Sequence, residues 1–201
     1  MAILRARGDA RWLAHALATL GRAALAQRDY EAARVVLEEA VAVARASGEL
    51  EATGDALEVR GQLAYYQGEY ALARALLEEQ PALRRAIGFA PRRGGAPLNW
   101  LGHIAVAEGD LAAARAQYAE SLAARQANPF FTVGLAFTLS GCANLAAALG
   151  ENARAARLAG AAARLCEAAG VPPRRVQEAG IDARLAASRR ALGEAAFPAA
   201  C

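Results

Sequence analysis

Apolar and small residues recur every three or four positions along most of this chain, and no stretch alternates with a period of two. The first pattern predicts amphipathic helices, and the absence of the second argues against strands. Alanine is the most abundant residue and favours helix throughout. The expected fold class is therefore all-α. Helices are predicted near residues 9–27, 30–46, 50–67, 70–87, 97–107, 110–126, 130–149, 152–169 and 174–192.

The helical pattern repeats with an interval of 40 or 41 residues, and four sequence columns keep this interval. A small residue of each first helix stands at Gly21, Gly61, Gly102 and Ala143. The turn column holds Arg28, Gly68, Gly109 and Gly150. The second helices supply Ala33, Ala73, Ala114 and Ala155, followed four residues later by Leu37, Leu77, Tyr118 and Ala159. Agreement of several columns indicates an internal repeat of two helices, whose copies bury a core by stacking.

These columns resemble the tetratricopeptide repeat, whose pattern is W-x2-L-G-x2-Y followed by A-x3-F. The third copy, which begins at Trp100-x-Gly102, carries Gly109-Asp110 and then Ala114-x3-Tyr118. The resemblance covers roughly residues 9–169 and implies a right-handed α-α superhelix. The interval near 41, in place of 34, implies longer helices or loops. We therefore expect one solenoid domain over 1–201, with repeats near 9–48, 49–88, 89–128 and 129–169 and a capping helix and tail at 170–201. Residues 89–96 are the longest predicted loop.

Extended repeats of this kind resemble the regulatory regions of bacterial signal-transduction ATPases and LuxR-type transcriptional activators. Those proteins carry a nucleotide-binding domain and often a DNA-reading helix-turn-helix module. This chain has no GxxxxGK[ST] loop and no segment left over for such a module. Two alternatives stay open, namely a standalone repeat protein and a fragment of a larger regulator.

Composition narrows the classes of partner and the cellular environment that the sequence predicts. All 23 basic residues are arginine, and the formal net charge of +3 is spread along the chain, so direct nucleic-acid binding through arginines is the weaker alternative. Cys142, Cys166 and Cys201 have neither zinc-ligand nor paired spacing, which favours a reducing, cytoplasmic setting. Cys142 and Cys166 are predicted to be small helix-packing residues. No signal peptide or membrane span is predicted.

The resemblance also implies which residues of the first helices line a concave groove. One column of the first helices holds a polar residue in every copy, and a second column lies one helical turn before it. In the second copy a tyrosine lies one turn after it. The candidate peptide-binding groove comprises Arg22, Glu58, Gln62, Tyr65, Asn99, His103, Ser140 and Asn144. The alternative is that these residues form the solvated stripe of amphipathic helices. The preference for amides, His and Ser over Arg and Glu favours the groove.

No enzyme is predicted, because the chain lacks a nucleophile elbow, a phosphate loop and a Ser-His-Asp pattern. His15 and His103 have no carboxylate or thiol at ligand-like spacing, so neither a metal nor a cofactor is expected. The sequence therefore predicts a non-catalytic module that binds a protein or peptide partner.

Overall fold

The computed structural model describes residues 9–86, 95–126, 132–171, 184–188 and 190. In this part of the chain the fold is all-helical and has no strand, which confirms the predicted class. Eight long helices begin and end within two residues of their predicted limits. They are α2 (Ala10–Ala26), α3 (Tyr30–Ser47), α4 (Leu50–Tyr66), α5 (Tyr70–Ala86), α6 (Gly95–Glu108), α7 (Leu111–Gln126), α8 (Thr132–Ala148) and α9 (Asn152–Ala168).

The chain divides into two compact units, Met1–Pro91 (unit 1) and Arg92–Cys201 (unit 2). The division falls within 89–96, the stretch that the sequence marks as the longest loop. The expectation of a single domain over 1–201 stays a prediction.

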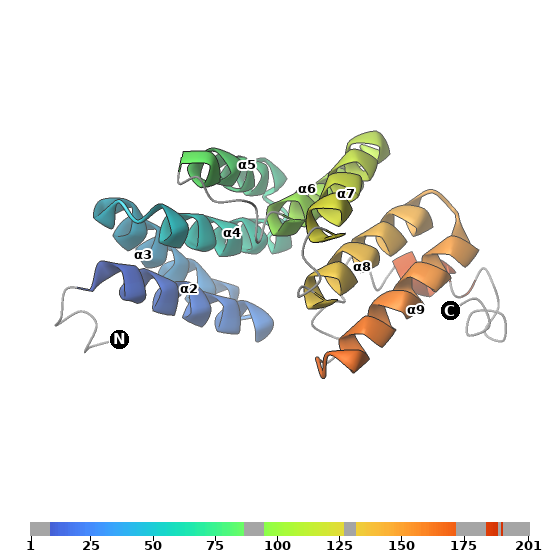
Figure 1. The fold of residues 1–201 in the computed structure, drawn as a ribbon, viewed down its shortest axis with the longest axis horizontal. Coiled ribbons are helices and arrows are strands. Elements are labelled where there is room, and N and C mark those ends of the chain that lie inside the picture. Colours follow the sequence, from blue (N-terminus) through green and yellow to red (C-terminus); the bar gives the residue numbers. More distant parts are fainter. Residues whose placement is uncertain (1–8, 87–94, 127–131, 172–183, 189, 191–201) are drawn as a thin grey trace. The chain divides into compact units, whose positions relative to one another are not determined.

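Consecutive helices form antiparallel pairs in both units (Figure 1). In unit 1, α2 packs on α3 and α4 packs on α5, while α2 also contacts α4. Unit 2 repeats this arrangement with the pairs α6–α7 and α8–α9, and with α6 against α8. Within each unit the first helices of the two pairs therefore lie side by side, as expected for a helical repeat.

The predicted capping helix is described over 184–188 and at 190, where the chain is helical. Leu185 is buried there in a cluster with Ala143, Ala146 and Ala155. This segment therefore contributes to the core of the last repeat. The remainder of the predicted helix lies outside the described residues.

The turns between paired helices share one backbone geometry. The turn column is left-handed in every copy, with φ of 61° at Arg28, 79° at Gly68, 84° at Gly109 and 76° at Gly150. In each turn the following residue donates its N–H to a carbonyl five residues earlier, as Glu69 does to Ala64 over 2.8 Å. Glycine adopts this conformation without steric cost, which explains its recurrence in three of four copies.

In the first three copies, the large residue of the second helix packs against the small residue of the first helix. A Cβ on Gly21 would meet the Leu37 side chain, one on Gly61 the Leu77 side chain, and one on Gly102 the Tyr118 ring. The partners are 16 residues apart in each copy, and Leu37, Leu77 and Tyr118 are fully buried. The first three helix pairs therefore each pack by one large side chain against a glycine backbone, which sets a close helix approach.

This packing predicts opposite effects for two glycine-to-alanine substitutions. A Cβ at Gly102 would lie 2.6 Å from Tyr118 Cε1, and the buried ring also lies close to Gly141, which limits the room for it to shift. We expect Gly102→Ala to lower the free energy of unfolding by about 1–3 kcal/mol through overpacking. Gly54, also helical, would place its Cβ within 4 Å of no atom outside its own helix. Gly54→Ala should raise stability by about 0.5–1 kcal/mol.

Urea denaturation followed by circular dichroism measures both variants. A Gly102→Ala protein as stable as the parent would contradict the packing.

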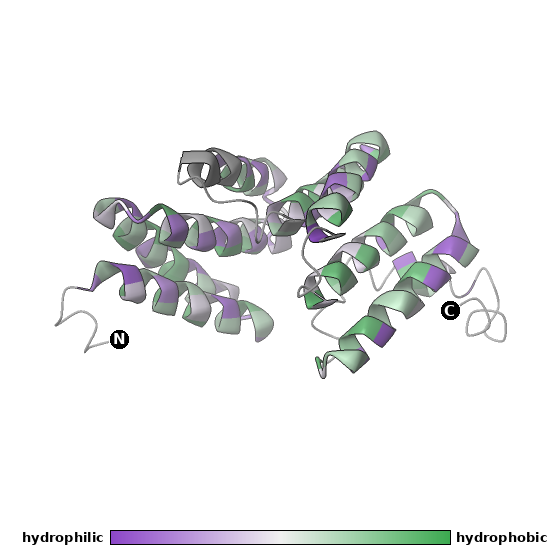
Figure 2. Cartoon of the chain, viewed as in Figure 1, coloured by the Kyte–Doolittle hydropathy of each residue, from purple (hydrophilic) through white to green (hydrophobic). Residues whose placement is uncertain are grey.

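The hydropathy of the described helices agrees with these packing contacts. Figure 2 shows green, hydrophobic ribbon over much of α8 and purple, hydrophilic positions along α2 and α4. Trp100 is buried in α6. None of the described helices has the length and apolar character needed to cross a membrane.

Candidate binding surface

The eight predicted groove residues fall into two sets that differ in burial. Arg22 on α2 is exposed, and Glu58, Gln62 and Tyr65 on α4 are partly buried, all within unit 1. The other four belong to unit 2 and are buried, each with 5% or less of its surface exposed. They are Asn99 and His103 on α6 and Ser140 and Asn144 on α8.

In unit 1, polar side chains of α2 meet those of α4 one repeat interval later. Arg11 Nη2 lies 3.2 Å from Glu51 Oε2, and His15 Nδ1 lies 3.4 Å from Asp55 Oδ2. The two residues of each pair are 40 positions apart, so each pair joins the same column of adjacent repeats. Because α2 and α4 are neighbours, the repeat interval places an arginine or histidine of α2 beside a carboxylate of α4 at both positions.

The polar stripe continues along α4 toward the turn. Gln62 Nε2 donates a hydrogen bond to Glu58 Oε1 over 3.2 Å, one helical turn away. Arg22 occupies the column of Gln62 on α2. We call the whole surface the α2–α4 face. It comprises Arg11, His15, Arg22, Glu51, Asp55, Glu58, Gln62 and Tyr65.

Four of the five tyrosines of the chain gather where this face ends. The ring centroids of Tyr65 and Tyr66 are 5.6 Å apart in an edge-to-face arrangement, and those of Tyr65 and Tyr70 are 5.8 Å apart. Tyr66 stacks on Tyr30 at 6.1 Å with the ring planes 11° apart. Tyrosines combine apolar area with a polar end and are common in binding surfaces.

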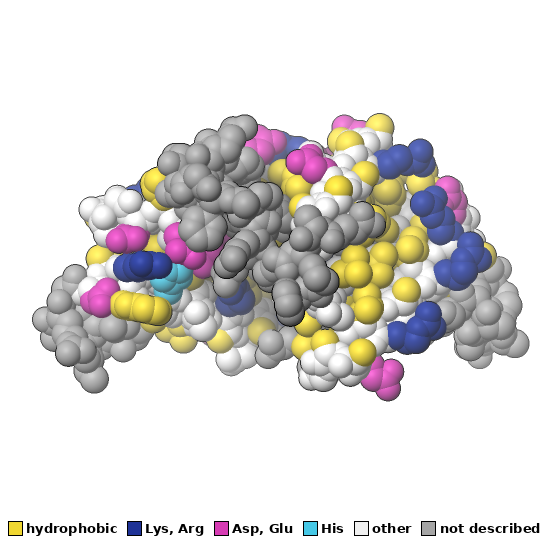
Figure 3. Space-filling view, in the orientation of Figure 1, with side chains coloured by type: hydrophobic (Ala, Val, Ile, Leu, Met, Phe, Trp, Pro, Cys, Tyr) yellow, Lys and Arg dark blue, Asp and Glu magenta, His cyan; other side chains and the backbone are white. Residues whose placement is uncertain are grey.

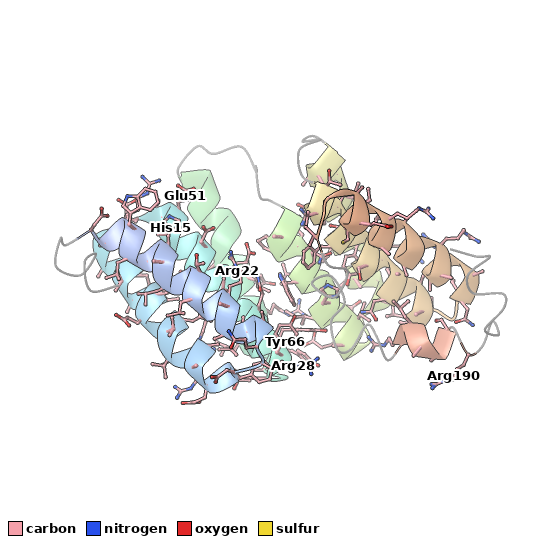
Figure 4. The ribbon with its side chains drawn as sticks, turned by 90° about the horizontal axis from the view of Figure 1, so that it is seen from below. His15, Arg22, Arg28, Glu51, Tyr66 and Arg190 are labelled. Carbon is pink, nitrogen blue, oxygen red and sulfur yellow. The ribbon has the colours of Figure 1, made fainter. Side chains whose placement is uncertain are left out.

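Figure 4 shows this order along unit 1. His15 and Glu51 lie toward one end of α2, and Arg22 lies farther along it. Tyr66 and Arg28 mark the opposite end. The α2–α4 face therefore runs from the Arg11–Glu51 and His15–Asp55 pairs to aromatic rings along the helix direction.

In unit 2 the equivalent columns form an internal network around His103. Tyr118 Oη lies 3.0 Å from His103 Nδ1, and Asn99 Nδ2 lies 3.1 Å from His103 Nε2. Burial lowers the pKa of His103 to about 3, so the ring is neutral at pH 7. If the Asn99 amide donates to Nε2, the neutral ring carries its hydrogen on Nδ1 and donates to the tyrosine oxygen.

The polar residues of α8 also form hydrogen bonds within unit 2. Asn144 Oδ1 accepts a hydrogen bond from Arg184 Nη1 over 3.1 Å, which ties α8 to the helical segment 184–188. Thr138 Oγ1 lies 3.0 Å from Ser121 Oγ and accepts from Arg125 Nε over 2.7 Å. These bonds satisfy polar groups that burial would otherwise penalise.

The two sets differ because different elements cover each column. Asn99 points toward α8, where its Oδ1 lies close to Gly141, and Asn144 meets Arg184. In unit 2, Asn99 therefore faces the next helix pair and Asn144 meets the segment that follows the last pair. These two side chains join consecutive elements of the stack. A partner could reach these four side chains only if the helices separated, so their role in binding stays a prediction.

Sequence reasoning missed the Arg11–Glu51 and His15–Asp55 pairs of the α2–α4 face. Partners three or four positions from His15 lie on its own helix, whereas Asp55 comes from the next repeat. The repeat interval of 40, visible in the glycine columns, is the signal that predicts this pairing.

The face can offer hydrogen-bond donors, acceptors and charges of both signs beside aromatic rings, which suits recognition of a peptide segment. The described residues include no group of three His, Cys, Asp or Glu side chains placed to hold a metal ion. No protein-family model matches the chain, and no curated protein matches it significantly.

Proposed function

We propose that the protein is a helical-repeat binding module and that the α2–α4 face takes a peptide segment of a protein partner. The repeat is tetratricopeptide-like in this proposal, and no catalytic step is assigned to it. The observation that carries the proposal is the difference between the units. One column that unit 2 uses for internal hydrogen bonds holds the exposed Arg22 on α2 and the partly buried Gln62 on α4, and the other holds the partly buried Glu58 on α4.

The chemistry of the face favours a peptide over a single small ion or an apolar ligand. The Arg11–Glu51 and His15–Asp55 pairs at one end and an amide and an arginine farther along can bond to the backbone and side chains of a peptide. The tyrosines supply apolar area and rigid contact at low entropic cost. Extended peptide segments are recognised by such alternation of polar positions and pockets.

The test begins with selection of a peptide from a random phage-displayed library against the full chain. Fluorescence anisotropy then gives the Kd of the selected peptide for the parent and for Arg22→Ala/Gln62→Ala. We expect the double substitution to weaken binding by about tenfold or more, equivalent to about 1.4 kcal/mol. Both side chains are at least partly exposed, so the fold should persist.

The matched control is Arg115→Ala/Gln27→Ala, which removes an exposed arginine and an exposed glutamine outside the face. The control should bind like the parent. Equal weakening in both variants, an unchanged Kd in the first, or a library that yields no binder would contradict the proposal.

A further inference from the structure

One side of α2 exposes a strip of apolar and small side chains, which we call the α2 flank. It comprises Trp12, Ala16, Thr19, Leu20 and Ala23, and their spacing places them along one side of a helix. Trp12 is 61% exposed and Leu20 is 48% exposed. Thr19 and Ala23 are also exposed, and Ala16 is partly buried. Figure 4 views unit 1 with α2 in front, and Figure 3 shows yellow hydrophobic side chains over α2 beside a cyan histidine.

The five residues of the α2 flank carry no charge. The polar one, Thr19, donates its hydroxyl to the backbone oxygen of His15 over 2.8 Å, so this group is satisfied within the helix. The flank borders the α2–α4 face, where the ring centroids of Trp12 and His15 lie 6.3 Å apart. Arg11, on that face, pairs with Glu51. The flank therefore offers methyl groups and an aromatic ring to a partner.

On α4 the same columns form the stacking surface of the repeat. The residues 40 positions later are 1% exposed or less, and they lie in hydrophobic clusters with side chains of α2 and α3. They are Ala52, Ala56, Val59 and Leu63, in the columns of Trp12, Ala16, Thr19 and Ala23. These columns of α4 are therefore buried against the preceding helix pair.

The later first helices bury two of these columns as well. The column of Thr19 holds Trp100 and Gly141, and the column of Ala23 holds Ile104 and Leu145, all of them buried. Among the described first helices, α2 alone exposes both columns. A repeat whose outer side stays in water is expected to be polar there, whereas this side is apolar. Exposed apolar patches mark contacts with other molecules.

The α2 flank is complementary to itself. A two-fold dimer brings the same patch of both chains together, so that patch must fit its own copy. Two uncharged flanks meet without repulsion, whereas a charged partner finds no opposite charge on the flank. In an antiparallel pair of α2 helices, the register that places Trp12 beside Ala23 also places Leu20 within one residue of Ala16.

We propose that two copies of this chain pair through their α2 flanks, with the bulky residues of each flank packed against the alanines of the other. The first three helix pairs already pack a large side chain against a small residue in this way. The proposed contact therefore uses packing that the fold itself employs.

A membrane surface fits the flank less well. Helices that lie in a membrane interface combine a broad apolar side with many basic residues on the polar side. Of the five flank residues only Trp12 and Leu20 are large, and the neighbouring Arg11 pairs with Glu51. We therefore expect a protein contact and no insertion into lipid.

Sedimentation of the full chain between about 1 and about 200 µM tests the proposal. We expect a monomer–dimer equilibrium with a micromolar Kd, because the flank of a single helix is a small interface. The dimer should persist when salt is added, since no charged pair of the flank holds it together.

Leu20→Glu/Ala23→Glu places two carboxylates on the flank and should raise the Kd of the dimer by about tenfold or more, because pairing would bury them. The matched control is Val35→Glu/Ala32→Glu on α3, which changes an aliphatic residue and an alanine with the same spacing at exposed positions. The control should dimerise like the parent, and circular dichroism checks the fold of both variants. Arg22→Ala/Gln62→Ala should also dimerise like the parent, which separates this contact from the α2–α4 face.

Trp12 reports on the contact directly. The chain has two tryptophans, and Trp100 is only 7% exposed, so a quencher dissolved in water reaches mainly Trp12. Acrylamide quenching should fall as the concentration of the parent or the control rises through the Kd. It should stay constant in Leu20→Glu/Ala23→Glu.

A chain that stays monomeric at every concentration would overturn the proposal, whether Trp12 is open to the quencher or already protected by another segment of the chain. Self-association that the α2 substitutions leave intact, that the control loses equally or that salt abolishes would also overturn it. So would a monomer that binds vesicles containing phosphatidylserine or a foreign helical-repeat protein through the flank, because the flank would then have a different occupant.

Discussion

Tyr118→Ala is expected to destabilise unit 2 by at least about 3–5 kcal/mol, the cost typical of truncating a buried aromatic side chain. Tyr118 is 1% exposed, and its ring fills the space beside Gly102 and Gly141. The substitution also removes the hydroxyl that lies 3.0 Å from His103 Nδ1. A buried polar group left without its partner adds about 1–3 kcal/mol.

Two further variants separate these contributions in urea denaturation. Tyr118→Phe keeps the ring and removes the hydroxyl, so it should cost about 1–3 kcal/mol. Tyr70→Ala truncates a partly exposed tyrosine of unit 1 and should cost less than Tyr118→Ala, because less apolar area returns to water. Equal costs for Tyr118→Ala and Tyr70→Ala would contradict the central role of the Tyr118 ring.

The buried His103 ring should make the protein less stable as the pH falls below about 6.5. In the unfolded chain the imidazole binds a proton near its ordinary pKa of about 6.5, whereas burial holds the folded pKa at about 3. Between these values the unfolded state binds more protons, so acidification favours unfolding. The loss attributable to His103 is about 1.4 kcal/mol per pH unit, or about 3 kcal/mol at about pH 4.5.

The measurement compares the parent with His103→Asn by urea denaturation from about pH 7 down to about pH 4.5. The variant keeps every carboxylate of the parent, so the difference between the two free energies isolates the histidine. We expect the advantage of the parent to shrink steadily as the pH is lowered. Parallel stability curves would show that His103 is not buried in its neutral form.

Much of the fold is predictable from spacing along the sequence. The columns of Gly102 and Tyr118 pair a glycine with a large residue in the first three copies, and the structure has this contact in all three. The turn column predicts the left-handed residues, including Arg28, where the side chain gives no hint of the conformation. These features were predictable because a repeat constrains the same local contact several times.

Whether the residues of the polar columns are buried or exposed was not predictable in the same way. Asn99 and His103 are as polar as Gln62, and polarity alone indicates solvent or a partner. Their burial depends on hydrogen bonds from other helices, such as the one with Tyr118 fifteen residues after His103. Whether a polar column faces a neighbouring helix depends on the next element of the stack, and a single helical pattern does not contain that information.

The most direct test of binding at the α2–α4 face is site-specific photo-crosslinking. A photoreactive p-benzoyl-phenylalanine is placed at position 62 of the full chain, with positions 27 and 115 as exposed controls, and the selected peptide is added. Crosslinking at position 62, with little at either control, is the predicted result. Crosslinking at the controls with none at position 62 would contradict binding at this face.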